Sequence, residues 1–453
     1  MLLYLLERDV EGGLGSVEIG GNHWRLVAYD LDASDAQDLA FICVSYTWGE
    51  GREPSPFHPS FDVSDRTIPA LTVIVSQRPS SARIWIDAFC VPLDNPERAL
   101  TLESMGYIYS RASEVIVVLS NAARPVLDQM RTSYRLDSIY LDVLERDEWV
   151  SRAWTYQEAV NSHQNLFITC DDPHGAIVDG IYFLNCLGYN LSRSRGLRFA
   201  SDKRQRYPRL DAFEDLIADY MTGYQERSAL QVMSNMDRRV QRRREDHFYA
   251  MIGAISTARA SSCETSDPCE AFMLVCERKG DYSFIYSAAK RDSTQFRRWR
   301  PVSGDLPSIL PWQCSGEGQP AHKESEFLYL DQMMLLENLS MDREGEKYVE
   351  SWLELSKVRS VGSPESLQES AYAALQFMGF KGSPDCISTT HGLFFPCERI
   401  SSDEETTILV ATQVGWAFGA PGIARCYGNA ELYTPGVFVG RIDNAVATSV
   451  KMS

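Results

Sequence analysis

The apolar residues of the first 170 positions gather in short continuous runs. Four such runs cover residues 41–44, 84–86, 115–119 and 166–170, the last of which contains one polar residue, Thr169. A strand that is apolar throughout is buried on both faces, as in a parallel sheet covered by helices. Helical spacing of apolar residues predicts a helix over about 97–112, whereas the short run at 71–75 is compatible with a strand or a helix. This succession predicts an α/β domain with a parallel sheet.

In the remainder of the chain, apolar residues follow other patterns. Residues 1–40 combine short apolar pieces with Gly-Gly turns, which predicts a small N-terminal flap. Helical periodicity dominates after about residue 170, so we expect a mainly helical extension with loops over 171–380. Gly and Pro then separate short apolar segments, which predicts a small β-rich unit over 381–453. The α/β domain itself should cover 41–170.

Polar and aromatic side chains stand at or close to the ends of the expected strands: Tyr46, Trp48, Asp87 and Ser120. In parallel α/β sheets, ligands bind beyond the carboxyl ends of the strands. We therefore expect these side chains to share one crevice. For Asp87 alone, capping of the loop after its strand is the simpler interpretation.

A further candidate lies on the helix expected to start near Asp147. Glu158 follows Trp154 by one helical turn, so a carboxylate lies next to an indole. Burial beside an aromatic ring raises a carboxyl pKa toward the range useful for catalysis. Spacing alone favours the simpler interpretation, in which Glu158 ends a helix and pairs with Arg152 or with solvent. In the same way, it favours a core role for Trp154.

Composition excludes several classes of function. The 453 residues carry 44 basic and 62 acidic side chains, a net charge of −18, which disfavours nucleic acid and anionic membranes as partners. No apolar stretch is long enough for a transmembrane helix, so we expect a soluble protein. The eleven scattered cysteines lack common zinc spacings, which predicts reduced thiols in the cytoplasm and no metal. The basic cluster at 238–244 is interpreted as a solvated segment entering a helix.

Three blocks in order resemble the fungal heterokaryon-incompatibility (HET) domain. They are Ser45-Tyr-Thr-Trp-Gly49, Trp85-Ile-Asp-Ala-Phe-Cys90 and Trp149 to Glu158. The resemblance implies a cytoplasmic protein of non-self recognition and programmed cell death, with self-association through this domain and an unknown protein partner. The family usually reads Cys-Ile-Asn-Gln after the acid, whereas residues 90–93 here read Cys-Val-Pro-Leu and lack the amide pair.

HET domains are in turn similar to Toll/interleukin-receptor (TIR) domains, whose strands end in Ser-Tyr and Val-Leu-Ser and whose helix carries a Trp and a Glu four positions apart. Positions 44–46, 118–120 and 154–158 repeat these features. The similarity implies a TIR-like, flavodoxin-like sheet and hydrolysis of the nicotinamide–ribose bond of NAD, which would be a substrate and no cofactor.

On this resemblance Glu158 is the catalytic candidate and Asp87 the second acid. Tyr46, Trp48, Arg152, Ser120 and Trp154 are the candidates for substrate binding. Two other functions remain open at this stage: a signalling module that self-associates without catalysis, and a small-molecule pathway protein of specialised metabolism.

Overall fold

The computed structural model describes residues 1–13, 15–31, 39–78, 82–133, 135–162, 165–193, 200–221, 227–260, 265–356, 366–400, 405–427, 431–442 and 446–453. Contacts between Cα atoms divide the chain into two compact units. Unit 1 holds residues 1–198, 203–224 and 239–264, and unit 2 holds residues 199–202, 225–238 and 265–453. Each unit is built on a large sheet of its own.

Four parallel strands form the centre of the sheet in unit 1. They are β4 (Ile42–Tyr46), β7 (Ile84–Ile86), β8 (Glu114–Leu119) and β9 (Leu166–Cys170). They lie in the order β9-β8-β4-β7, which is the 2-1-3-4 order of flavodoxin-like sheets read from one edge. The predicted α/β class and its parallel core are confirmed.

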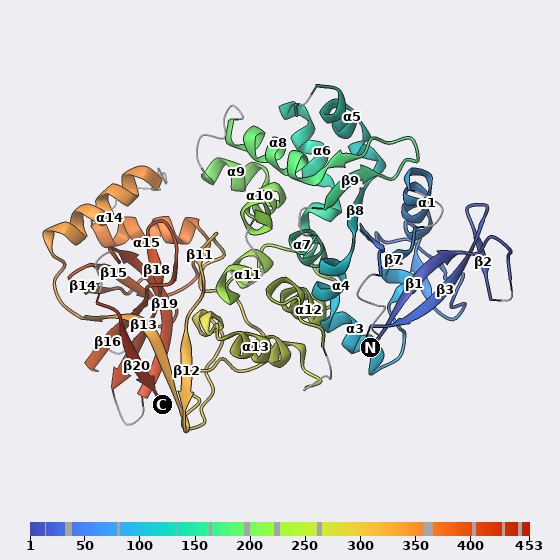
Figure 1. Ribbon diagram of the computed structural model, residues 1–453. Coiled ribbons are helices and arrows are strands. Elements are labelled where there is room, and N and C mark those ends of the chain that lie inside the picture. Colours follow the sequence, from blue (N-terminus) through green and yellow to red (C-terminus); the bar gives the residue numbers. More distant parts are fainter. Residues whose placement is uncertain are drawn as a thin grey trace. The chain divides into compact units, whose positions relative to one another are not determined.

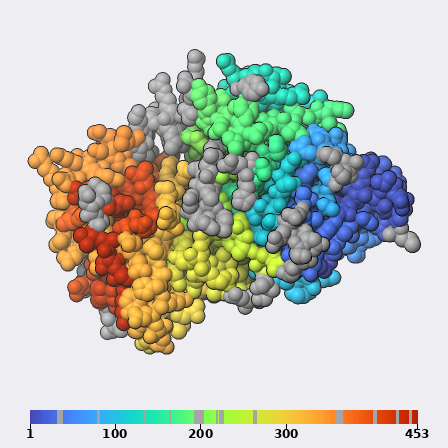
Figure 2. Space-filling view, in the orientation of Figure 1, coloured from blue at the N-terminus to red at the C-terminus, as the bar shows by residue number. Residues whose placement is uncertain are grey.

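Antiparallel strands extend this sheet at both edges, so it is mixed rather than wholly parallel. Next to β7 lie β1 (Leu2–Arg8), β3 (Asn22–Asp30) and β2 (Val17–Ile19), and next to β9 lies β10 (Val178–Asp179). The turn between β2 and β3 has Gly20 and Gly21 at φ +60° and +75°, which glycine adopts without strain. Residues expected to form a flap thus supply three strands, seen in dark blue at the surface of the unit in Figure 2.

Two helical expectations were resolved by the structure. The ambiguous run at 71–75 belongs to α1 (Thr67–Gln77). The single helix expected over 97–112 is wrong, because the chain forms α3 (Glu97–Glu103) and α4 (Met105–Arg111) with a break at Ser104. The hydroxyl of the buried Ser104 accepts a hydrogen bond from the N–H of Ala260 (3.0 Å), a contact 156 residues distant in sequence.

The other helices of unit 1 surround the sheet (Figure 1). They are α2 (Asp87–Cys90), α5 (Arg124–Ser133), α6 (Leu141–Arg146), α7 (Ala153–Val160), α8 (Gly180–Arg193), α10 (Pro208–Met221) and α12 (Arg244–Ile255). Helix α9 (Ala200–Arg206) precedes α10, and its residues are divided between the two units. A short antiparallel pair, β5 (Arg52–Pro54) and β6 (Asp62–Ser64), follows β4.

Unit 2 combines helices with an eight-stranded antiparallel sheet. Its helices are α11 (Ala229–Met236), α13 (Pro268–Lys279), α14 (Arg343–Ser356) and α15 (Leu367–Phe377). The sheet contains β12 (Ala321–Glu324), β13 (Phe327–Glu337), β14 (Ile387–Thr389), β15 (Gly392–Pro396), β16 (Glu405–Ala411), β18 (Gly419–Tyr427), β19 (Glu431–Gly440) and β20 (Thr448–Met452). The pair β11 (Ser315–Gly316) and β17 (Val414–Gly415) stands apart.

The expected β-rich C-terminal region is present, and strands β12 and β13 add to it from residues expected to be helical or looped. Buried side chains such as Phe394, Ile408, Val410 and Phe438 form the core of this sheet. Helix α14 packs against β15 and β19 (Figure 1).

Candidate functional site

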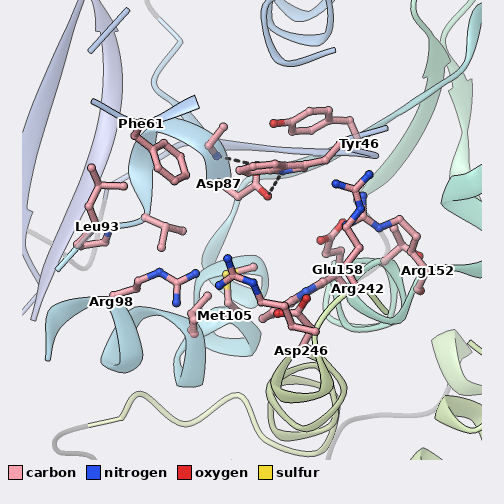
Figure 3. Close-up of a pocket in the computed structure, with 18 of the residues that line it drawn as sticks. Tyr46, Phe61, Asp87, Leu93, Arg98, Met105, Arg152, Glu158, Arg242 and Asp246 are labelled. Atoms are coloured by element: carbon pink, nitrogen blue, oxygen red, sulfur yellow. Dashed lines mark hydrogen bonds between the residues drawn. The ribbon is translucent and has the colours of Figure 1, made fainter. Parts of the chain in front are cut away.

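A cavity of about 320 Å³ opens at the carboxyl ends of β4 and β7 in unit 1. Its size lies at the lower end of the range for small-molecule sites, roughly 300–1,000 Å³. Helices α3, α4 and α7 and the start of α12 complete its wall (Figure 3). The lining residues are Tyr46, Trp48, Arg52, Phe61, Asp62, Asp87, Ala88, Val91, Pro92, Leu93, Arg98, Leu102, Met105, Arg152, Trp154, Thr155, Glu158, Arg242, Arg243 and Asp246.

Glu158 reaches the cavity from α7 and is only 6% exposed. The Ser45 hydroxyl at the end of β4 donates a hydrogen bond to Oε2 of Glu158, and the indole Nε1–H of Trp149 donates to Ser45 Oγ (2.7 Å). Burial raises the pKa of Glu158 to about 8, and the nearby Asp87 adds to the rise, while the Ser45 hydrogen bond and the charge of Arg152 oppose it. The carboxyl group is therefore held in one place and mostly protonated at neutral pH.

Asp87 directly follows β7 and is fixed by two hydrogen bonds. Its Oδ2 accepts from Nε1 of Trp48 (2.8 Å), and its Oδ1 accepts from the N–H of Ala88 (2.7 Å). Burial raises the pKa of Asp87, although both hydrogen bonds and the charge of Arg152 act in the opposite direction. The contact with Ala88 is the cap-like role that the sequence suggested, and the contact with Trp48 adds the orientation of an aromatic ring that lines the cavity.

The aromatic rings around the cavity are held by contacts to their edges and faces. The Tyr46 hydroxyl shares a hydrogen bond with Thr67 (2.8 Å). Trp48 meets Phe61 edge to face, with ring centroids 6.4 Å apart. Trp154 stacks on Tyr249 of α12 at 6.4 Å, with an interplanar angle of 14°. Rings restrained in this way keep the cavity open and present flat apolar surfaces to it.

The structure brings most of the sequence-derived candidates together and leaves one outside. Glu158, Asp87, Tyr46, Trp48, Arg152 and Trp154 all line the cavity, whereas Ser120 does not. The N–H and the hydroxyl of Ser120 both donate to Oδ2 of Asp147 (2.9 and 2.7 Å). Asp147 in turn caps the 3₁₀ turn Glu148–Ser151 by accepting from the N–H of Trp149 (3.0 Å). Ser120 thus holds the entry to α7 rather than a ligand.

The segment that replaces the family's amide pair forms an apolar part of the wall. Val91, Pro92 and Leu93 line the cavity directly after α2, where the sequence lacks the Asn-Gln pair. A ligand group that meets this wall gains from burial of apolar surface and finds no side-chain amide there.

Sequence reasoning missed the contribution of residues 239–246. The chain at Val240 pairs with the start of α7, because Ala153 N–H donates to the Val240 carbonyl (3.0 Å) and Val240 N–H donates to the Ser151 carbonyl (2.7 Å). Arg242 and Arg243 are exposed, as expected of a solvated segment, yet they also line the cavity. Asp246 follows on the first turn of α12, and a hydrogen bond from Trp154 opposes the rise that burial causes in its pKa.

Two glycines allow α12 to approach the helices that carry the site. A Cβ on Gly106 of α4 would lie 2.3 Å from the carbonyl oxygen of Gly253, and one on Gly253 would lie 1.4 Å from Oε1 of Gln157 on α7. The Gly253 carbonyl also accepts a hydrogen bond from the Asn161 side chain (2.6 Å). Close contact of the three helices fixes the wall that contains Glu158 and Asp246.

The described part of the chain contains no group of three or more His, Cys, Asp or Glu side chains suited to a metal ion. Within the same ranges, the helices are too short or too polar to cross a bilayer.

Comparison with known families identifies part of this region. Residues 41–140 match the sequence model of the family described as "Heterokaryon incompatibility protein (HET)". The match includes β4, β7 and β8 and ends before Arg152 and Glu158, so it covers the first two of the three blocks. No curated protein and no solved structure matches the chain significantly.

Proposed function

We propose, on the premise that this chain carries a heterokaryon-incompatibility (HET) domain at residues 41–140, that its cavity binds NAD or a related nucleotide and hydrolyses the nicotinamide–ribose bond. A HET domain supports a function of the heterokaryon-incompatibility type. The resemblance of residues 154–158 to the catalytic helix of TIR domains supports the narrower reaction. The observation that carries the proposal is one buried carboxyl group, Glu158, at the wall of a cavity that also holds Arg152 and Tyr46.

Cleavage of this bond requires little proton donation and depends mainly on a negative charge close to the ribose. When the bond between ribose C1′ and the pyridinium nitrogen breaks, its electron pair returns to the ring and nicotinamide leaves as a neutral molecule. The ribose develops oxocarbenium character, and water adds to C1′ and releases a proton. A carboxylate held against the ribose in a site with little bulk water stabilises this positive charge.

Glu158 meets these needs once the ligand is in place. With a pKa of about 8 in the free protein, roughly a tenth of Glu158 is ionised at pH 7. The positive charge of the nicotinamide ring favours the carboxylate, so binding lowers this pKa. Arg152 lies beside Glu158 in Figure 3 and is suited to hold the diphosphate. Tyr46 and Trp48 supply rings for stacking.

The test is release of nicotinamide from NAD by the purified full chain, assayed both dilute and clustered on a scaffold. We expect Glu158→Gln to lower turnover about 10²-fold or more, because it removes the carboxylate proposed to stabilise the ribose cation. Glu148→Gln is the matched control, since Glu148 is exposed and lies ten residues earlier. Because the carboxylate is the active form, kcat/KM should rise with pH up to about 8 and then level off.

Equal turnover by wild type and Glu158→Gln would remove Glu158 from the mechanism. If neither protein releases nicotinamide and toxicity on expression survives Glu158→Gln, self-association without catalysis becomes the better account.

A further inference from the structure

Arginine is concentrated around the cavity. Five guanidinium groups line it, from Arg52, Arg98, Arg152, Arg242 and Arg243. Four carboxyl groups share the lining, from Asp62, Asp87, Glu158 and Asp246, and burial keeps Glu158 mostly neutral at pH 7. The chain as a whole has a net charge of −18, so this local excess of positive charge runs against the overall balance.

Two of these arginines converge on one backbone carbonyl. The guanidinium groups of Arg52 (3.3 Å) and Arg242 both donate to the carbonyl of Gly49, and Arg52 also donates to Gly51 (2.6 Å). The guanidinium carbon of Arg52 lies 5.5 Å from the centroid of the Trp48 ring. These contacts orient the two side chains without cancelling their charges.

The other three guanidinium groups make no hydrogen bond and no ion pair within the described ranges. They belong to Arg98 on α3, Arg152 at the start of α7, and Arg243 just before α12. Arg98 and Arg152 are partly buried. A partly buried guanidinium that makes no hydrogen bond loses hydration, and for Arg152 the charges of Asp87 and Glu158 compensate this loss only in part. A bound phosphate would supply the missing hydrogen-bond acceptors.

The positions of these groups separate them into two sets. Arg152 lies on the side of the cavity that holds Glu158, whereas Arg98 lies on the opposite side (Figure 3). Helices α3 and α12 are in contact, so Arg98 and Arg243 project from neighbouring elements. A diphosphate held by Arg152 beside the ribose would leave Arg98, Arg242 and Arg243 without a phosphate, and the carboxyl group of Asp246, which interacts with Arg243, offsets only part of their charge.

We propose that Arg98, Arg242 and Arg243 form a second anion subsite, which binds a phosphate monoester in addition to the diphosphate of the nucleotide. The substrate class is then a pyridine dinucleotide that carries an extra phosphate, as NADP+ does, in preference to NAD+. Guanidinium groups are suited to this role because their paired N–H groups match phosphate oxygens. This assignment rests on the proposed function for the identity of the nucleotide.

The test measures binding, so that it is separate from catalysis. The full chain with Glu158→Gln prevents turnover, and calorimetric titration with NADP+ and with NAD+ gives the two affinities. We expect NADP+ to bind about tenfold more tightly, the effect of one charge-assisted phosphate contact. Arg98→Gln and Arg243→Gln should each lower affinity for NADP+ about tenfold and leave affinity for NAD+ unchanged.

Arg244→Gln is the matched control, because it removes the same charge from the same segment at an exposed position that does not line the cavity. Arg98→Lys keeps the charge and should restore part of the preference, which separates loss of the contact from loss of folding. Equal affinities for the two nucleotides, or equal losses for both in Arg98→Gln, would overturn the subsite. If NADP+ binds tightly but the wild type does not cleave it, the proposed reaction is contradicted and the anion subsite is still supported. If neither nucleotide binds, the proposed reaction and the anion subsite are both overturned.

Discussion

Replacement of Glu158 by glutamine isolates the free energy of keeping an acid inside unit 1. Glutamine has nearly the same shape, and its side-chain oxygen can accept the hydrogen bond that Ser45 donates to Glu158. The variant therefore preserves the shape of the side chain and removes its titration, and any change in its hydrogen bond with Tyr109 adds a contribution that does not depend on pH. Because Glu158 is 6% exposed and its pKa is raised mainly by burial, the effect of this change on stability must depend on pH.

The sign follows from the two pKa values. In the unfolded chain Glu158 ionises near its ordinary value of 4.5, whereas in the folded protein it holds its proton up to about pH 8. Between these values the folded state binds more protons than the unfolded state, so the wild type loses stability as pH rises. The loss relative to the variant is about 3 kcal/mol between pH 4.5 and 7 and approaches about 5 kcal/mol above pH 8.

Thermal unfolding of wild type and Glu158→Gln, followed from pH 5 to pH 8.5, measures this difference. For a unit of this size, 1 kcal/mol corresponds to roughly 2–4 °C in Tm. Between pH 5 and pH 7 the difference in stability grows by about 2.5 kcal/mol, so the difference in Tm should grow by about 5–10 °C, with the variant the more stable protein. Titrating groups that do not interact with Glu158 are common to both proteins and cancel, whereas the coupled Asp87 contributes to the difference. Glu148→Gln, at an exposed position, should give a flat difference. A flat difference for Glu158→Gln, or one of opposite sign, would refute the assignment of a buried neutral carboxyl group.

Three further substitutions test packing and placement. Gly106→Ala should destabilise unit 1 by about 3 kcal/mol in urea unfolding, because the new Cβ would lie 2.3 Å from the Gly253 carbonyl oxygen. A backbone atom cannot move away from this overlap as a flexible side chain can. A loss below about 1 kcal/mol would contradict the close contact between the helices. Ser120→Ala should cost about 1 kcal/mol through loss of its 2.7 Å hydrogen bond and leave nucleotide affinity unchanged, whereas weaker binding in titration would place it in the site. In unit 2, Arg300→Leu should cost roughly 2–3 kcal/mol, because it removes the partner of Glu270 (2.8 Å) and of the more buried Glu277 (3.0 Å). An unchanged urea midpoint would show that these ion pairs are dispensable.

Local sequence determined the elements that present the site. The strands at 42–46, 84–86, 114–119 and 166–170 could be predicted from their mainly apolar runs, because a strand that is buried on both faces consists mostly of apolar residues. The rule that ligands bind beyond the carboxyl ends of parallel strands placed Tyr46 and Asp87 correctly at the cavity. Helical spacing placed Glu158 one turn after Trp154, on the helix that forms the cavity wall.

Other features depended on contacts between residues far apart in the sequence, and no local pattern could reveal them. The break between α3 and α4 at Ser104 accompanies a hydrogen bond from Ala260, and Ser120 is drawn away from the cavity by Asp147. Arg242 joins the wall although it lies 84 positions after Glu158; the one signal available was the unusual concentration of arginine at 238–244 in an acidic chain.

What the sequence by itself determined was the set of strands and helices and the kinds of side chain at their ends, since periodicity and propensity are properties of neighbouring residues. The tertiary structure alone decided which of those side chains meet and in which state of charge. Burial of Glu158 requires β4, α4, α7 and the distant Asp87 to close around it, and that burial is what raises its pKa to about 8. Protonation and ligand preference therefore belong to the assembled unit, because desolvation arises only when remote segments of the chain pack together.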